Sequence, residues 1–111
     1  MITAKNATKM NQANLDVAAE IMRALAHPLR LQILSFIDKK GTTHVNRIYT
    51  ALKLEQSITS QHLRILRSAG LVKTERDGKF IFYSLDYKKI SEVNVIVKDY
   101  FENWNEEEEE N

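Results

Sequence analysis

The feature that most constrains this fold is a change of hydrophobic period at Gly70. Up to residue 69, apolar residues recur at intervals of three and four, which is the spacing of one face of an α-helix. From residue 71 to residue 85 the interval becomes two, and β-branched and aromatic residues are frequent, as in strands. Asp77-Gly78 interrupts this alternation and predicts a hairpin turn. The sequence therefore predicts a mainly α-helical domain that carries a β-hairpin.

Four helices are expected before the hairpin and one after it. Pro28 separates the first two, because the residue before a proline avoids the α region and proline suits a first helical position. Gly70 suits the left-handed residue that follows a helix, and Asp86 can cap the last helix. The resulting order is α-α-α-α-β-β-α. The expected helices cover residues 15–26, 29–39, 45–53, 56–69 and 88–104.

The length and the charge distribution divide the chain into three parts. A chain of 111 residues suits a single domain, expected over residues 13–104, after a flexible arm at 1–12 and before a disordered acidic tail at 105–111. Residues 102–111 hold six of the 15 acids, so the other 101 residues carry a formal charge of +7. No cysteine, apolar run of membrane length or signal-peptide core is present, and a cytoplasmic location is expected.

The two short helices and the hairpin predict a winged helix-turn-helix. In this motif the second helix enters the DNA major groove, N-terminus first. Short hydrogen-bonding side chains at that end can contact bases and phosphates, and arginines further along can reach the backbone. Basic residues at the hairpin can touch phosphate or a minor groove. The predicted DNA-binding residues are Gln56, Ser57, Thr59, Ser60, Gln61, Arg64 and Arg67 on the helix, and Arg76 and Lys79 on the wing.

Other roles compete with DNA binding for several of these residues. The serines and the threonine could simply face solvent, but the +7 body and the basic hairpin favour a surface for phosphate. His62 lies near the inward face and is expected to be a hydrogen-bonded core histidine. Arg30 is expected to hold the second helix in place, although it could touch a phosphate.

A dimer is also expected, through the first and last helices. The last helix has more apolar surface than a helix at the edge of a single chain needs, and the first has a long apolar stripe. Packing within one chain is the alternative. The predicted interface residues are Leu15, Ala18 and Met22 on the first helix and Val93, Val97, Tyr100, Phe101 and Trp104 on the last.

Three segments in this order resemble a known family. ALAHPLRLQILSFI, SITSQHLRILRSAGLV and RDGKFIFYSL are similar to segments of the ArsR/SmtB type of small bacterial repressors, and the resemblance spans about residues 15–104. It implies a homodimer that binds a pseudo-palindromic operator over its own promoter. It also implies that an effector releases the DNA and restores transcription.

The metal sites of the best-known members of that family have no match here. Many members carry a Cys-x-Cys pair where this chain has His44-Val45-Asn46, and others bind zinc through positions that correspond to Tyr87, Lys89, Tyr100 and Asn103. These residues are poor zinc ligands. No metal or other cofactor is therefore expected, although a composite site that uses His27, His44 or His62 stays open. The effector could otherwise be a small molecule or a protein, or be lacking altogether.

Two other classes of function are weighed against DNA reading. A winged helix can serve as a protein-interaction or dimerisation module, but apolar patches would then be expected where this chain has basic and hydroxyl side chains. An enzyme is not expected, because the sequence has no nucleophile elbow and no phosphate-binding glycine loop. A DNA-binding transcriptional regulator is the function that the sequence favours.

Overall fold

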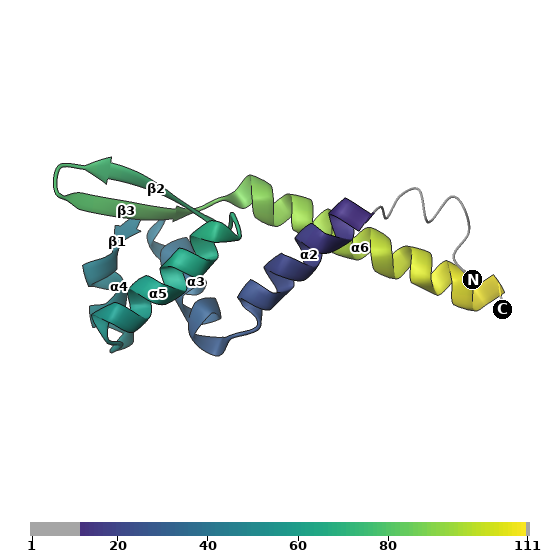
Figure 1. Ribbon diagram of the computed structural model, residues 1–111, viewed down its shortest axis with the longest axis horizontal. Coiled ribbons are helices and arrows are strands. Elements are labelled where there is room, and N and C mark those ends of the chain that lie inside the picture. The colour runs from purple at the N-terminus through teal and green to yellow at the C-terminus, as the bar shows by residue number, and fades with distance from the viewer. Residues whose placement is uncertain (1–11, 111) are drawn as a thin grey trace.

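The computed structural model describes residues 12–110, and Figure 1 shows that the β-hairpin projects from one end and the last helix from the other. Near the C-terminus it describes the side chains of Lys98, Asp99 and Glu102 but of no other residue after Ile96. The predicted arm at 1–12 lies outside the described residues except for Gln12, which begins a helix. The elements are α2 (Gln12–Leu25), α3 (Pro28–Lys40), β1 (Thr43–His44), α4 (Val45–Leu52), α5 (Gln56–Ser68), β2 (Val72–Asp77), β3 (Phe80–Leu85) and α6 (Tyr87–Glu110).

The junction of α2 and α3 forms as the proline predicts. His27 has extended backbone angles, and its Nδ1 accepts a hydrogen bond from the Leu29 amide. Pro28 then occupies the first turn of α3, where its missing N–H costs nothing. At the other end of α3, Gly41 takes φ +79° and donates its N–H to the Ile37 carbonyl. A side chain would be strained at that φ, so glycine suits the position.

The helix-turn-helix consists of α4 and α5 with a three-residue connection. Lys53 ends α4 in the left-handed conformation, with φ 56°, and the Leu54 amide donates to the Tyr49 carbonyl at 2.9 Å. Gly70 follows α5 with φ +79°, as the sequence predicts. From here the Leu71 amide donates to the Leu66 carbonyl and leads the chain into β2.

The hairpin has the predicted turn, and it gains a strand that the sequence did not predict. Asp77 pairs with Phe80, so Gly78 and Lys79 form the turn, and Gly78 has φ +63°. Thr43-His44, expected to be part of a link, forms β1 and pairs with the outer edge of β3. The sheet order is therefore β1-β3-β2. A two-residue strand is too short to leave a period in the sequence, which explains why it was missed.

The core lies where α3, α4 and α5 meet the sheet. Its fully buried side chains include Ile33, Ile37, Ile48, Leu63 and Leu66. These residues hold the two helices of the helix-turn-helix at a fixed angle. Ile58, in the first turn of α5, is 39% exposed and lies outside this core.

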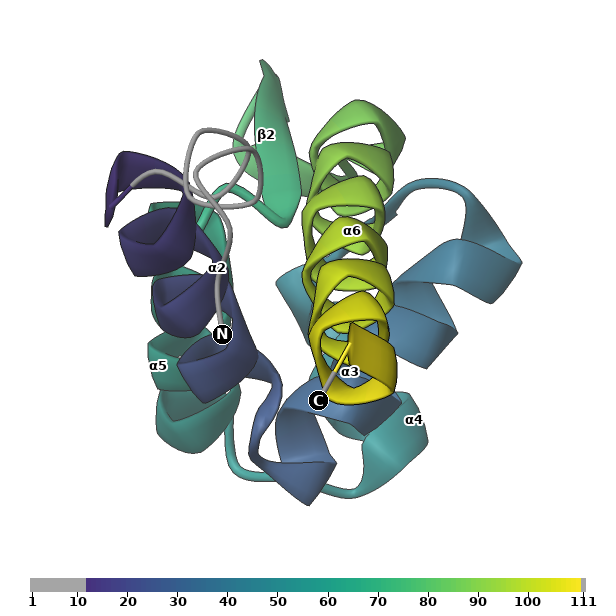
Figure 2. The same cartoon turned by 90° about the vertical axis from the view of Figure 1, so that its right-hand side faces the viewer.

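Helix α6 begins at its predicted cap and is longer than predicted. The Lys89 amide donates to the Asp86 carboxylate at 3.0 Å, which satisfies one amide of the first turn. The helix packs against α2, as the view along α6 in Figure 2 shows, and its backbone stays helical to Glu110. This helix covers residues 105–110, and the disordered acidic tail expected at 105–111 stays a prediction. None of the described helices is long and apolar enough to cross a membrane.

Candidate DNA-binding surface

The exposed face of α5 carries most of the side chains that were predicted to read DNA. Gln56, Ser57, Gln61, Arg64 and Arg67 are all exposed, and Ser60 is partly buried. The helix begins without a side-chain cap, because Glu55 makes no capping hydrogen bond. The first amides of α5 therefore face outward with the positive end of the helix dipole, an arrangement that suits a phosphate group.

Thr59 does not belong to this face, and its prediction as a DNA-binding residue is wrong. Its side chain is fully buried, and its hydroxyl donates to the Glu55 carbonyl at 2.9 Å. On a helix, successive residues are turned by about 100°, so Thr59 faces inward while Ser60 faces outward. Thr59 thus stabilises the first turn of α5 from inside.

His62 and Arg30 take the structural roles that the sequence favoured. His62 is 8% exposed, and the Arg30 guanidinium donates from Nε to its Nδ1 at 3.2 Å. Another guanidinium nitrogen of Arg30 donates to the Ala24 carbonyl at 3.2 Å. Ala24 lies in the last turn of α2, where carbonyls have no partner within the helix, so Arg30 supplies a donor. Arg30 therefore ties the recognition helix α5 to the end of α2.

The pKa of His62 is lowered in this environment. Burial lowers the pKa of His62 below its ordinary value, and the nearby His27 and Arg30 lower it further. The rings of His27 and His62 lie 4.6 Å apart, although the sequence gave no reason to bring them together. Arg30 can donate to Nδ1 of His62 only while the ring is neutral and Nδ1 carries no proton.

The wing places its two predicted basic residues at the tip of the hairpin. Arg76 and Lys79 are both exposed, at the end of β2 and in the turn. Among the side chains that the structure describes, neither they nor Arg64 and Arg67 form an ion pair with an acid. The wing and the N-terminal end of α5 lie at the end of the molecule remote from the C-terminal half of α6 (Figure 1). Four uncompensated positive charges thus accompany a hydrogen-bonding helix face.

This geometry agrees with comparisons against known proteins. Residues 27–74 match the family model described as bacterial regulatory protein, arsR family. The chain is 37% identical over 82 residues to MJ1325 of Methanocaldococcus jannaschii, an uncharacterized HTH-type transcriptional regulator. The aligned segment covers 74% of this chain and 92% of that protein. The chain belongs to the ArsR family. This ArsR-family protein is a DNA-binding transcriptional regulator and not an enzyme.

Solved structures confirm the winged helix-turn-helix. The crystal structure of the transcriptional repressor PagR of Bacillus anthracis matches with a TM-score of 0.67 at 35% identity, over 78% of this chain and 95% of PagR. The solution structure of Mb0332 from Mycobacterium bovis, a homodimeric winged helix-turn-helix DNA-binding domain, also matches with a TM-score of 0.67. Its identity is 32%, over 78% of this chain and 79% of that chain.

The residues predicted to form the dimer interface of this ArsR-family chain fall into three groups. Ala18 and Val93 are buried within the single chain and offer little surface to a partner, so their place in an interface stays a prediction. Leu15 is partly buried, and Met22 is 46% exposed and able to meet a partner. The side chains of Val97, Tyr100, Phe101 and Trp104 lie outside the described part of the structure.

The histidines of this ArsR-family chain do not gather into a metal site. Across the described residues, no group of three or more histidine and acidic side chains is placed to hold a metal ion. His27 and His62 lie side by side, but Nδ1 of each is already engaged by a donor. His44 lies on β1, against the aromatic rings of Phe80 and Phe82.

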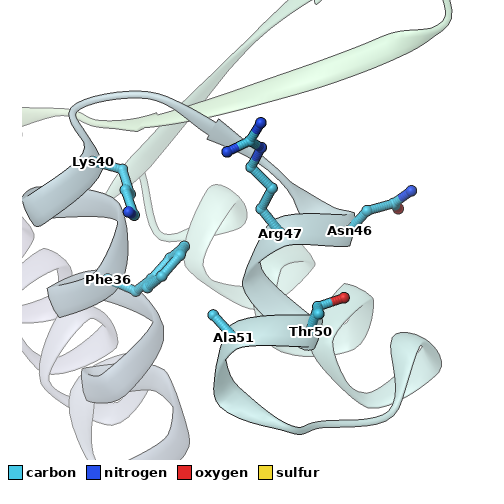
Figure 3. A pocket seen from close by; sticks show the side chains of 6 residues that line it. All are labelled: Phe36, Lys40, Asn46, Arg47, Thr50 and Ala51. Carbon is cyan, nitrogen blue, oxygen red and sulfur yellow. The ribbon is translucent and has the colours of Figure 1, made fainter.

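Two hollows beside α4 were not predicted from the sequence. Figure 3 shows the first, which is lined by Phe36 and Lys40 of α3 and by Asn46, Arg47, Thr50 and Ala51 of α4. The second shares Lys40 and Arg47 and continues toward the hairpin. Basic residues on two separate helices give no motif in the sequence, so only the tertiary structure brings them together.

Proposed function

We propose that this protein is a homodimeric repressor that reads an operator through α5 and the wing. The observation that carries the proposal is the exposed face of Gln56, Ser57 and Gln61, together with the basic side chains of the helix and the wing, which form no ion pairs. Amide side chains can make paired hydrogen bonds to adenine in the major groove. Arg64, Arg67, Arg76 and Lys79 would neutralise phosphates and set the orientation on the duplex.

A second copy of the chain would double this surface. We place the dimerisation and DNA-binding unit at residues 13–104. Met22 is an exposed apolar side chain on α2, and Leu15 lies on the same helix. Together with the apolar residues late in α6, they would bury a continuous surface across a two-fold axis. That symmetry would set the two α5 helices about 34 Å apart and match a pseudo-palindromic operator.

The regulated promoter is proposed to be the protein's own. Homology to named repressors supports repression, because both PagR and the SmtB repressor of Mycobacterium tuberculosis are described in that way. The SmtB match is 41% identical over 71 residues. An effector would release the DNA and restore transcription, and the protein would act in the cytoplasm.

Substitutions on the two parts of the surface test the assigned roles. Gln61→Ala should weaken binding to the operator selectively, by about 1–3 kcal/mol if the side chain makes a paired base contact. Lys79→Ala should weaken binding to operator and random DNA alike, and should reduce the salt slope by about one. Lys88→Ala, at an exposed position at the start of α6, is the control and should change neither.

Fluorescence anisotropy with labelled operator and random duplexes over a salt series would measure all three variants. Equal losses on both DNAs for Gln61→Ala and Lys79→Ala would contradict the separation of base reading from backbone contact.

A further inference from the structure

The second hollow beside α4 has the composition of a ligand site. It has a volume of about 390 Å³ and lies along β3 as far as Phe80 beside the tip of the wing, between the end of α3, β1, the first turn of α4 and β3. A volume of this size suits a ligand of one or two rings. None of the DNA-contacting residues assigned above lines it.

One wall of the hollow is aromatic. The His44 ring stacks on the Phe80 ring at 5.0 Å with 28° between their planes, and it meets the edge of the Phe82 ring at 5.7 Å. Phe80 is 41% exposed, so part of this apolar surface faces solvent. A planar ring laid against these side chains would cover apolar area and gain favourable ring-ring geometry.

The opposite side of the hollow is positively charged. Lys40 at the end of α3 and Arg47 in α4 both line it, and no acidic residue does. Within the described residues neither base forms an ion pair, and Lys40 lies over the Phe36 ring at 5.6 Å. The first amides of α4 add to this charge, because the N-cap residue His44 makes no side-chain capping hydrogen bond.

Two buried polar atoms beside the hollow have no partner in the described chain. They are the Thr43 hydroxyl and Nδ1 of His44, and the Thr43 side chain is only 2% exposed. Buried polar atoms almost always have hydrogen-bond partners, and those without one are a recurrent sign of a functional site. The two atoms lie beneath the surface of the hollow that their side chains line, so a small side-chain rotation would let a polar group of a ligand bond to them.

We propose that this hollow binds a small aromatic carboxylate. The ring would lie against His44, Phe80 and Phe82, and the carboxylate would be held by Arg47, Lys40 and the first amides of α4. A neutral aromatic molecule would leave the two bases unused, and inorganic phosphate would leave the aromatic wall unused. DNA phosphate is disfavoured for the same reason, since backbone contacts require no apolar wall.

The position of the hollow would let its occupant act on DNA binding. Strand β3 is half of the wing, and α4 leads directly into α5 through the turn at Lys53–Glu55. A ligand held between them would therefore bias the angle between the wing and the recognition helix. This consequence rests on the proposed function, whereas the binding of the ligand does not.

Titration of the full-length, ¹⁵N-labelled protein with benzoate tests the site without any DNA. Saturable shifts confined to the amide signals of β1, the first turn of α4 and β3 are expected. Benzamide, which has the same ring without the charge, and inorganic phosphate should each bind about tenfold more weakly. Benzamide or phosphate binding as well as benzoate, or the absence of saturable shifts at the hollow, would overturn the proposal.

Variants separate the site from general charge effects. Arg47→Gln should weaken benzoate about tenfold, while Lys88→Gln, which removes the same charge at an exposed site on α6, should leave it within about twofold. Thr43→Val keeps the shape of the side chain and should also weaken benzoate. If Arg47→Gln left the benzoate affinity unaltered, the site would be refuted. If the variant weakened only the binding of random DNA, Arg47 would be identified as a contact to the DNA backbone.

Discussion

The bond between Arg30 and His62 should control how firmly the recognition helix is held. Replacing Arg30 with methionine keeps a similar stem but removes the donor to both His62 Nδ1 and the Ala24 carbonyl. Each acceptor left unpaired in a buried place costs about 1–3 kcal/mol. Both bonds are only partly buried, so neither acceptor should reach the upper end of that range. We therefore expect a total loss of about 3 kcal/mol in the free energy of unfolding.

The loss should be visible in both denaturant and thermal unfolding at fixed protein concentration. For a domain of this size, 1 kcal/mol shifts the Tm by about 4–8 °C, so a fall of more than 10 °C is expected (about 3 kcal/mol). Arg23→Met, the same change at an exposed position on α2, is the control and should stay within about 0.5 kcal/mol.

The pH dependence gives a second test of the same contact. The pKa of His62 is lowered in the folded state, chiefly by burial and then by His27 and Arg30. The unfolded state therefore binds the proton more readily, and this contribution to stability is complete above the ordinary histidine pKa of about 6.5 and falls as the pH drops below it. In Arg30→Met one of the causes is removed, so the fall should become shallower.

A double-mutant cycle with His62→Phe would measure the coupling directly. We expect at least about 1 kcal/mol between the two positions, because they share a hydrogen bond. Additive losses, or an Arg30→Met variant as stable as Arg23→Met, would refute the view that this contact holds α5 against α2.

Two further substitutions test local features of the helices. Thr59→Val should leave the ratio of operator to random DNA binding unchanged in anisotropy titrations, because the hydroxyl is buried against Glu55; a selective loss on operator DNA would restore Thr59 to the reading face. Asp86→Ala should lower the free energy of unfolding by about 1 kcal/mol in urea titrations, because it removes the cap of the Lys89 amide. Asp99→Ala, within the body of α6, is the control for the lost charge, and equal effects of the two changes would contradict the capping role.

The sequence predicted those features that leave a local signature. The change of period at Gly70 and the Asp77-Gly78 turn predicted the hairpin, and Pro28 predicted the break between α2 and α3. Binding residues on a helix were predicted as a group, but the sequence could not separate inward Thr59 from outward Ser60. That distinction depends on the rotation of α5 about its axis, which packing of Leu63 and Leu66 sets.

Features that depend on distant segments could not be predicted. His27 and His62 meet only because α5 packs against the α2–α3 junction. The short strand β1 exists because β3 offers an edge to it. Lys40 and Arg47, the two basic residues of the second hollow beside α4, come from separate helices. Ala18 and Val93 have the apolar character of an interface, yet the packing of α2 on α6 within one chain covers them.

The most direct test of the central claim is anisotropy of the purified protein with labelled DNA from upstream of its own gene. Excess random competitor and a chelator would be present, at a salt concentration of about 0.15 M. The account predicts tight binding that resists the competitor and needs no metal. Binding no tighter than to random DNA would contradict an operator at its own promoter that the free protein recognises.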